Sequence, residues 1–119
     1  PAERKRIAKE FKSLGIHVNV CPGAALDMEQ DQKQHGPTRN SIAPVKELLE
    51  EGVIVALGTD NVSDIFMRFS SGDFRAEIEK LTNAIRWQDD LSKLADIATT
   101  NGRIVLGLPL PSEKEATNL

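Results

Sequence analysis

Apolar residues recur at helical spacing in several stretches of the chain. In the first stretch, Ile7, Phe11 and Leu14 are four and three residues apart, with charged residues between them. This spacing predicts an amphipathic helix that stops at Gly15. The same reasoning predicts helices over residues 2–14, 44–51, 73–87 and 91–98, and a last short one from a cap at Asn101 to Leu106. Ser71 or Asp73 is expected to cap the helix over 73–87.

Two short runs of consecutive apolar or β-branched residues predict strands. One runs from Ile16 to Cys21 and is closed by Pro22-Gly23. The other, from Val53 to Leu57, is apolar throughout, which is typical of a strand buried on both faces in a parallel sheet. Residues 23–43 show no period, so we expect a long loop that is either functional or disordered.

The order helix, glycine, strand occurs twice, at Leu14-Gly15-Ile16 and around Gly52. This alternation indicates βα units and a parallel α/β sheet. Only two strands are convincing, whereas sheets usually have more and parallel sheets need cover on both faces. We therefore expect a slice of a larger α/β protein, with an irregular tail over 109–119.

Composition narrows the class of protein. The chain has 119 residues, a net charge of −3 and a single cysteine, Cys21. The length suits one domain, the mild acidity argues against a nucleic-acid partner, and one cysteine excludes a disulfide framework. A reducing compartment, the cytoplasm, is therefore expected. The apolar run from Val53 to Leu57 is far shorter than the roughly 18 residues of a membrane span, so no membrane partner is expected.

Asp60 is the strongest candidate for chemistry, because sites in open α/β sheets and barrels gather at the carboxyl ends of strands. It is either a metal ligand or proton acceptor, or a turn residue that caps the next segment. Asp64 either supports the same site or forms a local Asx turn. Phe66, Met67 and Phe69 either line a ligand pocket or seal the top of the sheet.

Four motifs that would indicate a metal or nucleotide site are absent from the sequence. It contains no H-x-H, no H-E-x-x-H, no G-x-G-x-x-G and no phosphate-binding P-loop. Cys21 ends an apolar strand without a basic neighbour in sequence, so we interpret it as a small buried hydrophobic residue and not as a nucleophile.

One longer pattern joins the predicted helix, glycine stop and strand between Pro44 and Asp64. It reads Pro44-Val45-Lys46-Glu47-Leu48-Leu49-Glu50-Glu51-Gly52-Val53, then Val55-Ala56-Leu57-Gly58-Thr59-Asp60-Asn61, and then Asp64. This pattern resembles the metal-dependent amidohydrolase superfamily, most of all its cytosine deaminase-like enzymes, in which the eighth barrel strand ends in a similar way. The stretch Ala98-Thr99-Thr100-Asn101-Gly102 is similar to the segment that follows the barrel helices there.

The resemblance implies a (β/α)8 TIM-type barrel, of which residues 1–108 form the C-terminal part with strands seven and eight. A whole barrel takes about 250 residues. By the same resemblance, Asp60 binds a divalent metal (Zn or Fe) and accepts the proton of the hydrolytic water. Asn61, Asp64 and Phe66 correspond to residues that line the substrate pocket. The implied reaction is deamination of a cyclic amidine or nucleobase-like small molecule.

Several features depart from the family pattern. The family's H-x-H and the histidines of its fifth and sixth strands are absent, and we expect them upstream of Pro1. A catalytic zinc needs about three protein ligands, so the 119-residue chain alone is expected to be inactive. Asn61 stands where bacterial cytosine deaminases often have a second aspartate, which puts cytosine in doubt as the substrate. The whole enzyme is expected to be a homo-oligomer.

A function of a different class stays open: a stand-alone, non-catalytic α/β module that binds a ligand or assembles. Two βα units leave two unpaired strand edges, so such a module should oligomerise. Bound metal at Asp60 would count against it.

Overall fold

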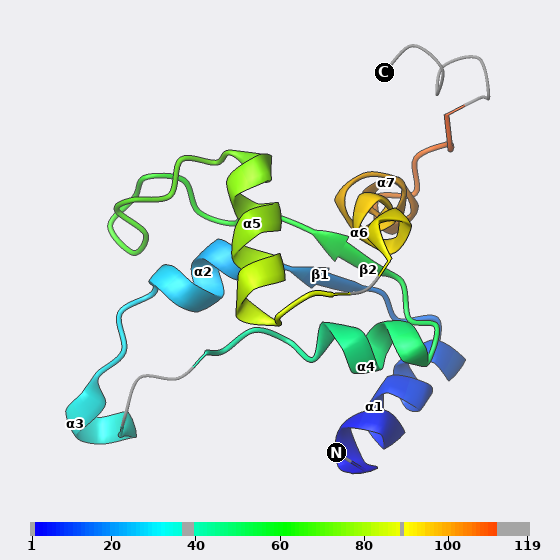
Figure 1. Cartoon of the computed structure of the whole chain (residues 1–119), viewed down its shortest axis with the longest axis horizontal. Coiled ribbons are helices and arrows are strands. Elements are labelled where there is room, and N and C mark those ends of the chain that lie inside the picture. Colours follow the sequence, from blue (N-terminus) through cyan, green and yellow to red (C-terminus); the bar gives the residue numbers. More distant parts are fainter. Residues whose placement is uncertain (1, 37–39, 89, 112–119) are drawn as a thin grey trace.

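A computed structural model describes residues 2–36, 40–88 and 90–111 of the chain (Figure 1). Helices surround a small sheet, as the α/β prediction requires. The elements in chain order are α1 (Ala2–Ser13), β1 (Val18–Val20), α2 (Pro22–Asp27), α3 (Gln32–His35), α4 (Val45–Glu50), β2 (Val55–Leu57), α5 (Phe74–Ala84), α6 (Leu91–Ala98) and α7 (Thr100–Val105). In these residues no helix is long and apolar enough to cross a membrane.

β1 and β2 form a parallel pair with Val18 opposite Val55 and Val20 opposite Leu57. The predicted parallel pairing is confirmed, although both strands are shorter than predicted. Each strand follows a helix whose end is succeeded, two residues on, by a glycine with positive φ: +66° at Gly15 before β1 and +76° at Gly52 before β2. A residue with a Cβ rarely adopts this left-handed conformation, which explains the glycine stop.

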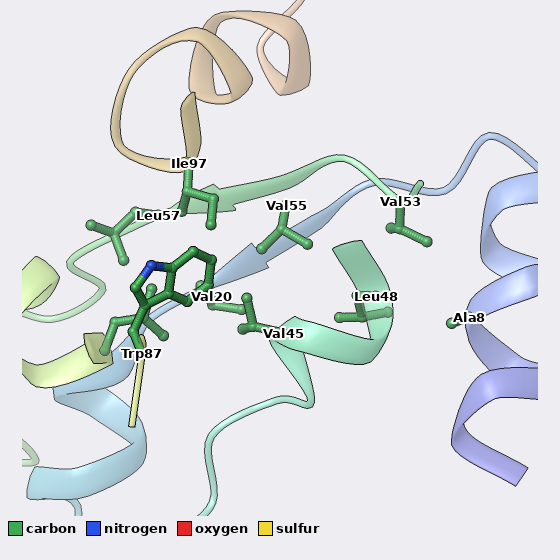
Figure 2. Close-up of a cluster of buried hydrophobic side chains, with 10 residues drawn as sticks. Ala8, Val20, Val45, Leu48, Val53, Val55, Leu57, Trp87 and Ile97 are labelled. Carbon is green, nitrogen blue, oxygen red and sulfur yellow. The ribbon is translucent and has the colours of Figure 1, made fainter. Parts of the chain in front are cut away.

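The core lies between the sheet and the helices that cover it. Val20 and Leu57 pack with Val45 of α4 and Ile97 of α6, and Figure 2 shows the indole of Trp87 among these aliphatic side chains. β2 is buried along its whole length, as its apolar sequence predicts. Asn19, between the two β1 valines that pack against the core, is exposed.

The prediction that residues 23–43 lack regular structure is wrong for two short segments. α2 has six residues, most of them small, and α3 has four polar residues. Both helices are too short to show an apolar period. α3 begins at a local turn in which an Asp31 carboxylate oxygen accepts from the Lys33 amide at 2.9 Å. α2 depends on a contact from far along the chain, described below. Residues 37–39 lie outside the described part.

The C-terminal helices differ from prediction in their ends. Asp73 caps α5, as predicted, by accepting a hydrogen bond from the Arg75 amide at 2.8 Å, but the helix ends at Ala84 and not at residue 87. Asn101 is not a cap, because α7 already begins at Thr100. Its side-chain amide donates to the carbonyl of Val55 at 2.8 Å and so ties α7 to β2. Residues 109–111 form no helix or strand, and the rest of the predicted tail lies outside the described residues.

Candidate functional site

The two connections that leave the carboxyl ends of β1 and β2 lie against each other. The Gly58 amide donates to the Val20 carbonyl at 2.8 Å, which joins the first residue after β2 to the end of β1. A Cβ on Gly58 would lie 2.6 Å from Asn19 Nδ2 and 3.1 Å from Cys21 Sγ. A side chain at position 58 would therefore displace the Asn19 amide, and the close approach places the segments that carry Cys21 and Asp60 at one edge of the sheet.

Asp60 lies three residues after β2 and is exposed to solvent. Its φ of +59° is in the left-handed region, which aspartate tolerates better than most residues. Its carboxylate has no hydrogen-bond or ion-pair partner among the described residues. The protein therefore presents an uncompensated acid at the carboxyl end of the sheet, where the sequence predicts one.

Cys21 stands at the end of β1 and is partly buried. Burial raises the pKa of its thiol above the usual range, and the carboxylates of Asp60 and Glu77 add to this effect. A thiol with a raised pKa holds little reactive thiolate at neutral pH. This agrees with the interpretation that Cys21 is not a nucleophile.

Asn61 and Asp64 are bound to each other within the connection after β2. Asn61 Nδ2 donates to Asp64 Oδ2, and Asp64 Oδ1 accepts from the amides of Phe66 at 2.9 Å and Met67 at 2.8 Å. These hydrogen bonds, that of Asn61 first, lower the pKa of the Asp64 carboxyl. The pair orders the loop, as the Asx-turn interpretation of Asp64 predicts. Their predicted contact with a substrate stays a prediction.

The large apolar residues of this loop divide into two groups. Met67 is buried, with 1% of its surface exposed, and so fills the interior. Phe66 and Phe69 are 63% and 93% exposed, respectively. Of the two predicted roles, Met67 therefore has the sealing one. The Phe66 ring is accessible to a ligand.

Glu77 of α5 is a buried acid that the sequence analysis missed. Only 2% of it is exposed, and its Oε2 accepts from the Gly23 amide at 2.6 Å. The sequence does indicate its burial, because Glu77 lies three residues after Phe74 and four before Leu81, on the apolar face of α5. A charged residue on such a face needs a buried partner.

The described residues do not form a complete metal centre. No three of their His, Cys, Asp or Glu side chains come together in a way that fits a metal ion. The Asp60 carboxylate is a suitable oxygen donor without a competing partner, so it fits as one ligand. The other ligands would have to come from outside the described part of the chain.

Comparison with known proteins gives one informative similarity. Over 103 residues the chain is 30% identical to a protein of Syntrophomonas wolfei named 5-methylthioadenosine/S-adenosylhomocysteine deaminase. The match covers 78% of this chain and 23% of that protein, so the chain spans less than a quarter of the relative's length. No protein-family model matches the chain. No solved structure matches it either.

The similarity bears on the resemblance stated above. A relative named as a deaminase is consistent with an enzyme of the amidohydrolase type. The relative's name does not confirm the cytosine deaminase-like branch.

Proposed function

We propose that this chain is the C-terminal part of the catalytic barrel of a metal-dependent amidohydrolase that deaminates a nucleobase-like ring. The observation that carries the proposal is the Asp60 carboxylate, exposed and without a partner at the carboxyl end of a parallel α/β sheet. The deaminase relative supports the same reaction class. In this proposal β1 and β2 are strands seven and eight of the barrel.

Asp60 would hold a divalent metal, Zn or Fe, together with ligands from outside the described residues. When bound, such an ion lowers the pKa of water and provides a nucleophile near neutral pH. The Asp60 carboxylate accepts the proton that the attacking water loses as its oxygen bonds to the ring carbon. It then donates this proton to the ring's amino nitrogen, the C–N bond breaks, and ammonia leaves.

The substrate we propose is an adenine nucleoside or a related aminated ring. The relative's name contains two adenine nucleosides, and Asn61 departs from the acid that is common in cytosine deaminases. Phe66 would stack on the ring, while the pair of Asn61 and Asp64 holds the loop in place. We further propose a cytoplasmic homo-oligomer as the working enzyme.

The test is ammonia release by the full-length protein that contains this chain, with 5′-methylthioadenosine, S-adenosylhomocysteine, adenosine and cytosine as substrates. We expect activity on an adenine nucleoside. Asp60→Asn should lower kcat by about 10²- to 10⁴-fold, because the amide cannot accept the proton. Prior removal of metal by a chelator should abolish activity in the wild type.

Asp96→Asn is the matched control, since Asp96 is an exposed aspartate on α6, outside the two connections that follow the strands. It should retain wild-type kcat. Activity that survives Asp60→Asn would refute the assigned role of this residue. A full-length protein that binds no added Zn or Fe and releases no ammonia from any of the four substrates would favour the non-catalytic module.

A further inference from the structure

α2 and α5 contact each other, and each belongs to a different connection at the candidate site (Figure 1). α2 follows the end of β1 with only Cys21 between them, while α5 follows the long connection that carries Asp60. The contact between the two helices therefore joins the two connections at a second place, beyond the hydrogen bond from Gly58 to Val20. A buried hydrogen bond from Gly23 to Glu77 is at its centre.

The N-terminus of α2 needs an acceptor that its own sequence does not supply. Pro22 has no N–H, so Gly23 is the first residue of the helix with an amide to satisfy. Cys21, the capping residue, makes no side-chain hydrogen bond to the helix. Pro22, Gly23 and Ala24 are buried, which keeps water from replacing the missing cap. The carboxylate of Glu77 takes this place from 54 residues away.

The contact constrains both partners. A Cβ at position 23 would lie 2.4 Å from Glu77 Oε1 and 3.0 Å from its Cδ, so the carboxylate reaches the amide only because residue 23 is glycine. Lys80 extends the link, with Nζ 2.8 Å from Asp27 Oδ2 and 3.4 Å from Glu77 Oε1. Both ends of α2 are thus attached to α5.

We propose that Glu77 is a positioning residue of the candidate site, holding residues 21–27 beside the connection that carries Asp60. This deepens the proposed function and rests on it. The held segment begins beside the connection that leads to Asp60, because a Cβ on Gly58 would lie 3.1 Å from Cys21 Sγ. Loss of the contact should therefore weaken substrate binding more than it slows the chemical step at Asp60.

The experiment measures amide hydrogen exchange and steady-state kinetics in the full-length protein. Glu77→Ala and Gly23→Ala should each speed exchange over residues 23–27 by roughly 10- to 100-fold, since each removes a hydrogen bond to a charged acceptor. Exchange in α1 should stay unchanged. Glu77→Gln keeps an acceptor oxygen and should restore most of the protection. Glu79→Ala, at an exposed glutamate of the same helix, should resemble the wild type.

The double variant Gly23→Ala/Glu77→Ala adds a test of the pair. If both residues act through one contact, its exchange should match that of the single variants and not the product of their effects. The kinetic expectation is a severalfold rise in KM for Glu77→Ala with a smaller change in kcat.

Several results would overturn the proposal. The first is exchange over residues 23–27 that is no faster in Glu77→Ala than in Glu79→Ala, and the second is an equal acceleration in α1. The others are multiplicative effects of the two substitutions on exchange and an unchanged KM in Glu77→Ala. A wild-type protein without deaminase activity would refute the proposed function instead. The exchange data would then decide alone whether Glu77 positions residues 21–27.

Discussion

The connections that leave β1 and β2 start side by side and are held in different ways. The first turns at once into α2, whose initial residues are buried and bound by Glu77 of another helix. The second, over residues 58–73, is held largely by its own side chains. Asp64 binds the amides of Phe66 and Met67, and Ser63 Oγ donates to the Ser70 carbonyl at 2.7 Å.

The two connections therefore differ in whether contacts with another helix or hydrogen bonds within the loop hold them in place. The first connection depends on α5 for the buried acceptor at the start of α2, whereas the second contains most of its own hydrogen-bond partners. At a site formed from both, the first is expected to loosen when packing is lost. The second is expected to loosen when its own polar groups change.

Leu81→Ala should have the largest effect and should act mainly on the first connection. Leu81 is fully buried in the core, and its truncation should lower the free energy of unfolding by about 3–4 kcal/mol. Because α5 carries Glu77, native-state exchange should accelerate more over residues 23–27 than over residues 64–67.

Asn83→Ala, on the exposed side of the same helix, is the control for Leu81→Ala and should change stability by less than about 0.5 kcal/mol. Chemical denaturation gives the stabilities and amide exchange gives the local effect. Equal acceleration in both segments would show that the second connection also depends on α5.

Met67→Ala should have a somewhat smaller effect, directed at the second connection. Met67 is its buried apolar anchor, and the loop can partly close around a smaller side chain, so we expect a loss of about 2–3 kcal/mol. Phe66→Ala is the matched variant, because the neighbouring ring is mostly exposed. It should cost less than about 0.5 kcal/mol and yet raise KM. Equal losses of unfolding free energy in Met67→Ala and Phe66→Ala, measured by chemical denaturation, would contradict the different roles given to these two residues.

Acidification should produce the smallest of the three effects on the second connection. The lowered pKa of Asp64 means that its stabilising contribution is present above the ordinary aspartate value of about 3.9. It is lost as the pH falls through the lowered value. The Phe66 and Met67 amides, followed by NMR from pH 6 downward, should therefore stay protected at pH 4 and lose protection below it.

Asp64→Asn removes the titrating group and should abolish this acid-dependent step. A step centred at or above the ordinary value in the wild type would show that the folded loop does not stabilise the ionised carboxylate. The prediction for Asp64 would then be wrong.

Much of the fold follows from hydrophobic spacing alone. The periods around Phe11 and Leu81 predict α1 and α5, and the run from Val53 to Leu57 predicts a buried parallel strand. These elements are visible because each buries an apolar face formed by residues close in sequence.

The missed features depend on partners distant in sequence. α2 has no apolar period, and its first amide is satisfied by Glu77, so neither residue alone predicts the contact. Asparagine is common at helix caps, so the sequence predicted a cap at Asn101. Its hydrogen bond to the Val55 carbonyl is visible only in the folded chain. At the candidate site, the place of Asp60 was predictable from the strand before it, whereas its lack of a partner was not.

Asn101 also affects which strand could be added beside β2. In the parallel ladder, Ile54 and Gly58 bond toward β1, so the carbonyl of Val55 points to the opposite, free edge. The Asn101 amide lies where the N–H of an incoming strand would bind that oxygen. A neighbour on this edge, whether from the same polypeptide or another copy, is therefore expected to begin pairing at Leu57. One side chain thus limits the alignments available to strand exchange and edge-to-edge aggregation.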